Sequence, residues 1–248
     1  MASDLKKRLA EHRREEVHGH KLGPYIQDIV YGGHDGIITT FAVVAGTEGA
    51  SLPVFVLLIL GFANLFADAL SMGAGAFLSL KSELDQYERL KKEELQEIAT
   101  DPEVEREEIR EAYATKGFKG KDLERAVEII TSNKERWAEA SMLEEHGLTR
   151  ESSSRPLLHG LMTFVGFLIF GIVPLIPYLF RPQAQNIFPI AIAGTAAALI
   201  LLGATRSVVT RERIYRGALE IVALGGITAV VAYGIGYFLR ELAVTFVG

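Results

Sequence analysis

The fold is decided by the stretch VFVLLILGFANLFADALSMGAGAFLSL (54–80), which continues without a break into KSELDQYERLKKEELQEIA (81–99). The first part is apolar enough to cross a bilayer, whereas the second is so charged that it must stand in water. All of Pro53–Ala99 is predicted to be one helix. At about 1.5 Å per residue it would be on the order of 70 Å long, roughly twice the thickness of a bilayer core.

The charge of the chain is concentrated in one segment. Residues 81–155 hold 14 Lys/Arg and 20 Asp/Glu, a net charge of −6 against −5 for all 248 residues, so the remainder is near neutral and mostly apolar. Such an acidic segment argues against nucleic acid as a partner and favours a cation. The chain has no cysteine, which excludes disulfides and thiolate metal sites. Its first 22 residues are charged and show no cleavable signal peptide.

Five membrane spans are predicted in an all-α protein. The first, Tyr25–Ala50, is less hydrophobic than a typical span, and a hydropathy scan can miss such a segment. Its glycines would allow another helix to approach closely, and Glu48 near its end is expected to be solvated at the membrane surface. The second span is 54–80. The other three are Leu157–Phe180, with a kink or early end at Pro174 and Pro177, then Ile187–Thr205 and Gly217–Leu239.

The predicted domains follow from these spans. They are a charged N-terminal arm (1–23), spans 1 and 2 (24–80), an acidic domain of three to four helices (81–155), and spans 3 to 5 (156–248). Asp101-Pro102-Glu103 is a helix-start signal with Asp101 as the N-cap. The arginine-rich loop 206–216 indicates a cytoplasmic position. With five spans, the N-terminus and the acidic domain are then cytoplasmic as well.

Three pairs of potential metal ligands recur at i, i+3 on three separate helices of the acidic domain. If the pairs converge, they would form a cluster of carboxylate oxygens with one soft sulfur, which suits Mn²⁺ and Fe²⁺. A solvated face is the alternative, because glutamate is common on exposed helices. The pairs are Glu94/Glu97, Glu105/Glu108 and Met142/Glu145, with His146 as a further possible ligand.

A second set of polar residues lies inside the predicted spans. Asn64, Asp68 and Met72 follow each other at i, i+4 and i+8, so they share one helix face. Asp28 and Asp35 share a face of the first span. Acidic residues inside a membrane indicate function because placing them there costs free energy. The structural alternatives are that Asp35 caps a helix broken at GGHDG and that Asn64 bonds across helices.

Several of these motifs resemble the vacuolar iron transporter family, whose yeast member loads iron and manganese into the vacuole. YIQDIVYGGHDGIITTFAVVAG (25–46) and ALSMGAGAFLSLKSE (69–83) are similar to the family's membrane motifs. EREEI (105–109), Trp137 and the M-x-x-E of residues 142–145 resemble its cytoplasmic metal-binding domain. The resemblance covers residues 24–240, nearly the whole chain.

The resemblance implies a homodimer of five-span protomers that exports ferrous iron from the cytosol with proton antiport, through a pore between the protomers. Asp35 and Met72 match the family's intramembrane residues. Its cytoplasmic ligands match Glu94, Glu97, Glu105, Glu108, Met142 and Glu145. Two positions differ from plant-like members: Asn64 replaces a glutamate, for which Asp68 one turn further can compensate, and Ser141-Met142 replaces a methionine pair.

The sequence thus predicts a divalent-metal/proton antiporter rather than an enzyme, without a prosthetic group. Fe²⁺ is the expected ion, with Mn²⁺, Zn²⁺ and Co²⁺ as further candidates, and Asn64, Asp68, Met72, Asp28 and Asp35 form the expected path. A prokaryotic cell membrane is expected, with a vacuolar membrane as the alternative. A membrane-anchored metal buffer or sensor without flux is the second reading. An intramembrane metalloenzyme is disfavoured because the sequence has no H-E-x-x-H and no E-x-x-H on the acidic helices.

Overall fold

The computed structural model describes residues 5–9, 25–149, 155–180, 186–210 and 214–247, and all regular structure in these ranges is helical. The chain divides into two compact units. We call residues 1–75 and 158–248 the membrane unit and residues 76–157 the acidic unit. Most of the predicted N-terminal arm and part of the loop 206–216 lie outside the described residues.

The long helix predicted from the sequence is present as α3 (Val54–Thr100), a single helix of 47 residues. No proline interrupts it, and its second part is rich in Glu, Lys, Gln and Leu, which favour helices. Its first part belongs to the membrane unit and the rest to the acidic unit. The prediction of one uninterrupted helix over this stretch is confirmed.

Four helices of the described residues are long and apolar enough to cross a membrane. They lie at Val54–Thr100, Pro156–Phe180, Ile187–Thr205 and Ile221–Leu242. The helix α2 (Ile26–Gly49) forms where the first span was expected, but it is not one of these four. Its acidic residues and glycines lower its hydropathy. The count of five spans therefore stays a prediction.

The third predicted span is broken at its prolines, as expected. It consists of α7 (Pro156–Gly171), a 3₁₀ turn at Val173–Leu175 and the short α8 (Ile176–Phe180). Proline has no N–H to donate, so the α-helical hydrogen-bond ladder cannot continue through Pro174. The last two helices, α9 (Ile187–Thr210) and α10 (Ile214–Val247), extend beyond the apolar ranges predicted for them, since no helix breaker follows those ranges directly.

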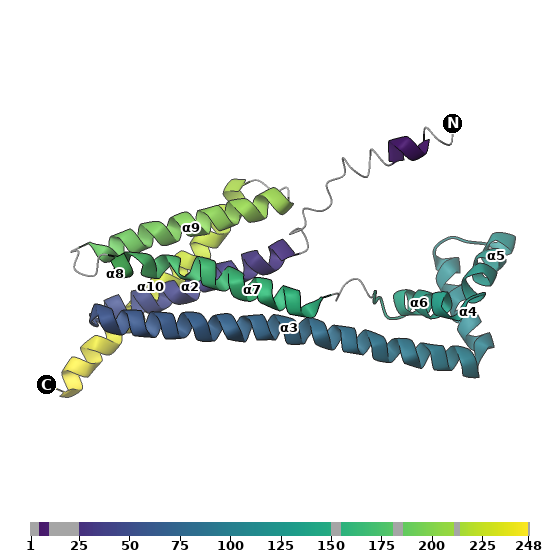
Figure 1. The fold of residues 1–248 in the computed structure, drawn as a ribbon, viewed down its shortest axis with the longest axis horizontal. Helices are drawn as coiled ribbons and strands as arrows, with labels where there is room; N and C mark the ends of the chain where they lie inside the picture. Colours follow the sequence, from purple (N-terminus) through teal and green to yellow (C-terminus); the bar gives the residue numbers. More distant parts are fainter. Residues whose placement is uncertain (1–4, 10–24, 150–154, 181–185, 211–213, 248) are drawn as a thin grey trace. The chain divides into compact units, whose positions relative to one another are not determined.

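The central helix of the membrane unit is α2, which contacts α9 and α10 and also packs against α7 (Figure 1). A Cβ atom at Gly32 would lie 2.3 Å from the backbone oxygen of Thr163, and one at Gly36 would lie 2.4 Å from that of Phe167. Contact positions advance by four residues on both helices, so α2 and α7 run parallel. Only glycine permits backbones to approach this closely.

The other three long helices run in both directions relative to α2 and α7: α3 and α9 are antiparallel to the pair, and α10 is parallel to it. On α3, Gly61 lies against Leu175 and Gly73 against Gly160, so α3 runs antiparallel to α7. On α10, Gly225 lies beside Ile38 and Gly236 beside Gly46, so α10 runs parallel to α2. Phe41 stacks with Phe188 at the start of α9, while Ile37 packs with Leu199 and Leu202 further along it, which makes α9 antiparallel to α2.

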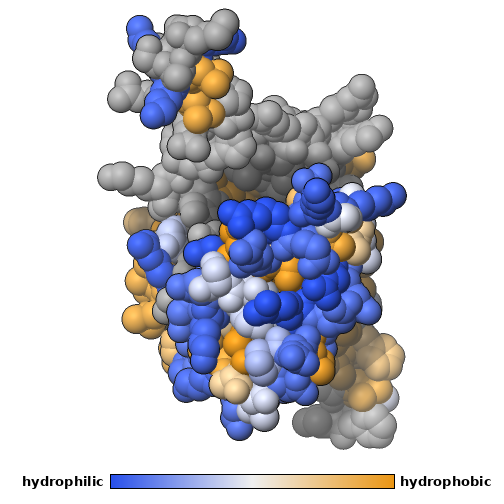
Figure 2. Space-filling model, turned by 90° about the vertical axis from the view of Figure 1, so that its right-hand side faces the viewer, coloured by the Kyte–Doolittle hydropathy of each residue, from blue (hydrophilic) through white to orange (hydrophobic). Residues whose placement is uncertain are grey.

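The acidic unit contains α4 (Pro102–Thr115), α5 (Gly120–Thr131), α6 (Lys134–Glu144) and the C-terminal part of α3. Its core consists of Ile98, Ile109, Val127, Trp137 and Ala138. Asp101 occupies the N-cap position of α4 as predicted, but its side chain makes no capping hydrogen bond. Figure 2 shows one face of the acidic unit, and this face is mostly hydrophilic with small apolar spots, as expected of a unit in water.

We predict that Gly36→Ala destabilises the membrane unit, because the new methyl group would collide with the backbone of Phe167, which cannot move without shifting α7. Overpacking of this kind costs about 1–3 kcal/mol. Thermal unfolding of the purified protein in detergent measures the effect. Gly226→Ala is the matched control, because a Cβ atom there meets nothing within 4 Å. Equal melting temperatures for the two variants would contradict the close contact.

Candidate metal-binding and transport sites

The acidic unit brings five of the predicted glutamates together from α3, α4 and the C-cap of α6. With His146 they form three overlapping sets of three residues. Within each set every residue offers one potential ligand atom, and these three atoms lie within 4.8 Å of one another. The three sets are Glu94, Glu97 and Glu105; Glu105, Glu108 and Glu145; and Glu94, Glu145 and His146. Because the sets share members, they form one connected group, which we call the acidic cluster. These groups could hold a metal ion, and their carboxylate oxygens are donors that suit hard or borderline divalent cations.

Two carboxylates of the acidic cluster are buried, although burial of a charge is expensive unless it is compensated. Glu94 is 3% exposed and Glu105 is 7% exposed. One oxygen of Glu94, Oε1, lies 2.9 Å from Nε2 of His146. The other, Oε2, is buried and has no hydrogen-bond partner among the described residues. A buried carboxylate oxygen without a partner is the atom that a bound cation would satisfy.

The pKa values of two glutamates in the acidic cluster also reflect the cost of burying several carboxylates together. Burial, and after it the charges of the neighbouring carboxylates Glu108, Glu94 and Glu97, together raise the pKa of Glu105 to about 7. Burial likewise raises the pKa of Glu145 to about 7, together with repulsion from Glu94, Glu108 and Glu105. Like charges disfavour each other's ionisation. Glu105 and Glu145 therefore bind protons more tightly than ordinary glutamates, and a cation bound by the cluster would displace those protons.

His146 belongs to the acidic cluster, and Met142 is a further predicted ligand on α6. His146 was only a further possible ligand in the sequence, and the structure places it beside Glu94. Met142 lies one helical turn before Glu145, and its side chain is fully buried. The role of Met142 as a soft ligand stays a prediction.

In the membrane unit, the polar stripe of α3 is ordered by a hydrogen bond within the helix. Nδ2 of Asn64 donates to Oδ2 of Asp68 at 2.7 Å, so the alternative in which Asn64 bonds across helices is not what the structure shows. Asp35 on α2 is close enough to Asp68 for the two carboxylates to interact electrostatically. Met72 is half-buried and packs against the hydrophobic core. Asp35, Asn64, Asp68 and Met72 thus come from facing elements of one unit.

The alternative role of Asp35 as a helix cap is wrong. α2 is continuous through the GGHDG segment, and Asp35 lies well inside it. The glycines of that segment serve the contact with α7 instead, since Gly32 and Gly36 abut the backbone of that helix. Asp35 is therefore an acidic residue in mid-helix with no capping function.

Asp28 has a partner that the sequence analysis missed. Its Oδ2 lies 2.6 Å from Nδ1 of His159, near the start of α7. The ring of Tyr25 packs against the imidazole with centroids 4.8 Å apart. A histidine inside the apolar segment 157–180 was the available signal, because ionisable residues are rare in membrane spans.

Glu48 was expected to be solvated, and the structure shows that it is half-buried and also has a protein partner. Its Oε1 accepts a hydrogen bond of 2.8 Å from the hydroxyl of Tyr178, which is fully buried. Since Asp28 pairs with His159 and Glu48 with Tyr178, polar contacts close both ends of the α2 face that packs on α7 and α8.

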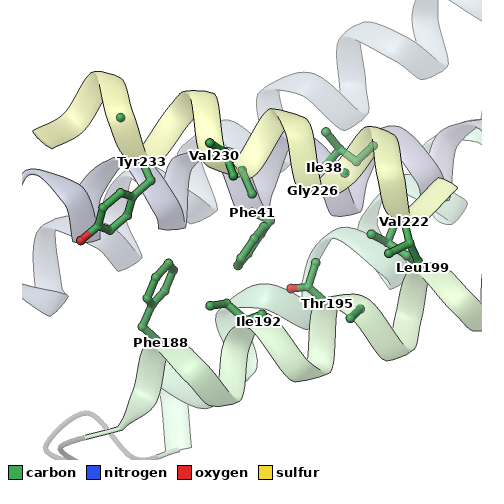
Figure 3. Close-up of a pocket in the computed structure, with 14 residues that line it drawn as sticks. Ile38, Phe41, Phe188, Ile192, Thr195, Leu199, Val222, Gly226, Val230 and Tyr233 are labelled. Carbon is green, nitrogen blue, oxygen red and sulfur yellow. The ribbon is translucent and has the colours of Figure 1, made fainter. Parts of the chain in front are cut away.

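A large cavity of the membrane unit is not a candidate ion site. It measures about 590 Å³ and lies between α2, α9 and α10. Figure 3 shows its lining, in which Phe41, Phe188 and Ile192 are typical and Thr195 and Tyr233 carry the oxygen atoms. Among the described residues that line it, none contributes a carboxylate, imidazole or thioether. Such a surface cannot replace the hydration shell of a divalent cation.

The chain is similar to known transport proteins over most of its length. It matches the VIT family over residues 26–237. It is 32% identical over 225 residues to "Vacuolar iron transporter 1" of Oryza sativa subsp. japonica, covering 91% of this chain and 89% of that protein. It is 33% identical over 246 residues to "Vacuolar iron transporter" of Toxoplasma gondii, covering 96% of this chain and 81% of that protein.

We predict that the metal-free acidic unit loses stability as the pH rises from about 5 to 8. The pKa of Glu105 is 4.5 in an unfolded chain and about 7 in the folded one, so the folded state binds the proton more tightly and ionisation opposes folding across this window. Fluorescence of Trp137, the one tryptophan of the chain, reports the unfolding because its side chain lies in the core of this unit.

The matched variants for this measurement are Glu105→Gln and Glu103→Gln, both on α4. The first should reduce the pH dependence, whereas the second should leave it unchanged because Glu103 is exposed and outside the acidic cluster. A melting temperature that does not depend on pH in the unsubstituted protein would show that the cluster is not strained by its own charge.

Proposed function

Because the chain belongs to the VIT family, we propose that it exports Fe²⁺ from the cytosol across a membrane in exchange for protons. A role in metal transport follows from the relatives, which are named as vacuolar iron transporters. The direction, the proton coupling and the use of Mn²⁺ as a second substrate are parts of the proposal. The observation that carries it is the coexistence of an acidic cluster in the acidic unit and an aligned set of acidic residues in the membrane unit.

Five spans are part of the proposal, and the direction of α2 supports them. α2 runs parallel to α7 from the pair Asp28–His159 to the pair Glu48–Tyr178. The segment containing α7 and α8 is long and apolar enough to cross a membrane. A helix that accompanies it over this length would have to cross too. The low hydropathy of α2 is tolerable because neighbouring helices cover much of it.

The acidic cluster is proposed to collect the ion before transport. Its carboxylates and the imidazole of His146 are oxygen and nitrogen donors of the kind that Fe²⁺ and Mn²⁺ accept. The unpartnered Oε2 of Glu94 supports this role, as does the proton affinity of Glu105 and Glu145 near neutral pH. Binding of a cation would release these protons. The cluster would thereby raise the local concentration of the ion.

The path through the membrane unit is proposed to involve Asp28, Asp35, Asn64, Asp68 and Met72. Asp35 and Asp68 can each hold a proton or share a cation, but a carboxylate that holds a proton is a poor metal ligand. This exclusion is the physical basis of the antiport. Asn64 contributes by holding the carboxylate of Asp68 in place through its hydrogen bond of 2.7 Å.

A homodimer with its pore between protomers is proposed as the working form. The side chains of Asn64, Asp68 and Met72 are only half-buried in one chain. Leu60, one helical turn before Asn64 on the same side of α3, is an exposed apolar residue that extends this face. A second copy against this face would enclose the polar stripe between two α3 helices. Intramembrane polar residues are expected to face such a protein interior rather than lipid.

The membrane of residence is also proposed rather than observed. We favour a prokaryotic cell membrane because the connections between the membrane helices are short, with the acidic unit facing the cytoplasm. The vacuolar membrane, which the names of the relatives mention, is the alternative. Zn²⁺ and Co²⁺ are further candidate substrates, since the same donors bind them.

A metal buffer or sensor without transport is the second candidate function. The acidic cluster alone would suffice for it, whereas the acidic residues of α2 and α3 would then have no task. Flux separates the two candidates, because a buffer binds the ion without moving it across the bilayer.

We predict that Asp35→Ala lowers the rate of Fe²⁺ uptake into proteoliposomes by about tenfold or more, because the path loses its central carboxylate. Asp85→Ala is the control, since Asp85 is exposed and forms only a surface ion pair with Lys81 at 3.0 Å. Uptake by the unsubstituted protein should rise with an opposing proton gradient. Uptake that ignores the gradient would refute the antiport while leaving metal transport intact.

We further predict that Glu94→Gln weakens Fe²⁺ or Mn²⁺ binding by about tenfold or more, because the charged ligand at the centre of the cluster is lost. Titration calorimetry in two buffers of different ionisation enthalpy measures the affinity and the protons released together. Glu93→Gln is the neighbouring control, since that side chain is exposed and pairs with Arg89 at 2.7 Å. Equal affinities in the two variants would show that Glu94 is not a ligand of the bound ion.

A further inference from the structure

His159 is an ionisable residue of the membrane unit to which the proposed path gives no task. Its Nδ1 lies 2.6 Å from Oδ2 of Asp28, and the two side chains are 20% and 18% exposed. The pair sits in the contact between α2 and α7, where each partner is costly to place in a membrane. A hydrogen bond alone could be made by less expensive residues, so the pair requires a further explanation.

The tautomer of the imidazole in this contact depends on the ionisation of Asp28. An ionised Asp28 can only accept, so Nδ1 of His159 must carry the proton that is shared between them. In the neutral ring the lone pair is then on Nε2. A histidine whose one nitrogen donates to a carboxylate while the other is free to coordinate is the usual arrangement of a metal-binding histidine. The structure therefore presents a nitrogen ligand together with the group that orients it.

The surroundings hold this ligand in a fixed position. Tyr25 is 8% exposed, and its ring lies 4.8 Å from the imidazole at an angle of 57°. One helical turn further, Gly32 brings α2 against the backbone of Thr163. The close contact between the two helices thus continues directly from the pair. A ligand held by such rigid elements needs little reorganisation when it binds an ion.

The position of the pair matches the course of the proposed path. Asp28 precedes Asp35 by seven residues, so it lies about 10 Å away along α2 and on nearly the same face. In the proposed orientation it lies on the cytoplasmic side of Asp35. An ion entering from the cytosol would meet Asp28 and His159 before it meets Asp35 and the Asn64–Asp68 stripe.

We propose that Nε2 of His159 is a ligand of the transported ion at the cytoplasmic entrance of the membrane path, with Asp28 as the residue that orients it. This inference rests on the proposed transport function and adds a determinant of selectivity to it. Among the path residues Asp35, Asn64 and Asp68 offer oxygen and Met72 sulfur. An imidazole nitrogen favours Fe²⁺, Co²⁺ and Zn²⁺ over Mg²⁺ and Ca²⁺, and favours Co²⁺ over Mn²⁺.

The first test measures selectivity with the full chain in proteoliposomes. Uptake of Co²⁺ and Mn²⁺ is compared in the unsubstituted protein, His159→Gln and Asp28→Asn. We expect the Co²⁺-to-Mn²⁺ uptake ratio to fall by about tenfold in His159→Gln, and by a smaller factor in Asp28→Asn, which loses the charge that orients the ring. Tyr178→Phe is the control, because it removes another buried hydrogen bond between helices, the one to Glu48. It should lower the melting temperature and leave the ratio unchanged.

The second test uses the absence of cysteine from the chain. His159→Cys introduces a single thiol, which should react with a water-soluble methanethiosulfonate reagent if the side chain reaches the path. Co²⁺ should slow this reaction, and Cd²⁺ should block transport by the variant at a concentration at least tenfold lower than in the unsubstituted protein. This readout does not require His159→Gln to fold.

The outcomes separate the two levels of the proposal. If the unsubstituted protein moves none of Fe²⁺, Co²⁺ and Mn²⁺, the transport function fails and with it the role of His159. If it transports, but His159→Gln keeps the same uptake ratio and only melts earlier, the pair is a structural hydrogen bond and the inference is overturned. A thiol at position 159 that does not react, or that Co²⁺ does not protect, overturns it as well.

Discussion

The membrane unit depends on the close contact between α2 and α7. Glycines at positions 32 and 36 bring the two backbones within the distance that a single methyl group would occupy. This contact fixes the parallel direction and the register of both helices, and the polar pairs Asp28–His159 and Glu48–Tyr178 follow from that register. Once α2 is held in this way, Asp35 is placed where it interacts with Asp68 of α3.

In the acidic unit, unlike the paired polar groups of the membrane unit, charges of one sign are packed together. Its helices are held by a small apolar core that includes Trp137 and Ile109. That core forces Glu94 and Glu105 into a buried position where each disfavours the ionisation of its neighbours. The free energy gained by packing this apolar core therefore offsets the repulsion between the carboxylates. A divalent cation would relieve the repulsion, and this couples the stability of the unit to the ion that it binds.

The two proposed sets of ligands differ in ways that would suit different tasks. The acidic cluster is rich in carboxylates, partly open to water and able to exchange protons near pH 7. The membrane set has fewer charges and mixes oxygen, nitrogen and sulfur donors. An open site with many weakly committed ligands suits collection of an ion. A sparse site of mixed donors suits discrimination, because each ligand contributes a larger share of the binding energy.

The sequence by itself determined the helical class, the 47-residue α3, the break at Pro174 and the grouping of glutamates at i, i+3, because each depends on local pattern. It also indicated the family through its motifs. Only the tertiary structure decided which pairs converge, that Glu48 is bonded to Tyr178, and that Asp28 meets His159. Those residues are 130 and 131 positions apart. No periodicity links positions so distant, and their meeting is set by the backbone contact that the glycines of α2 allow.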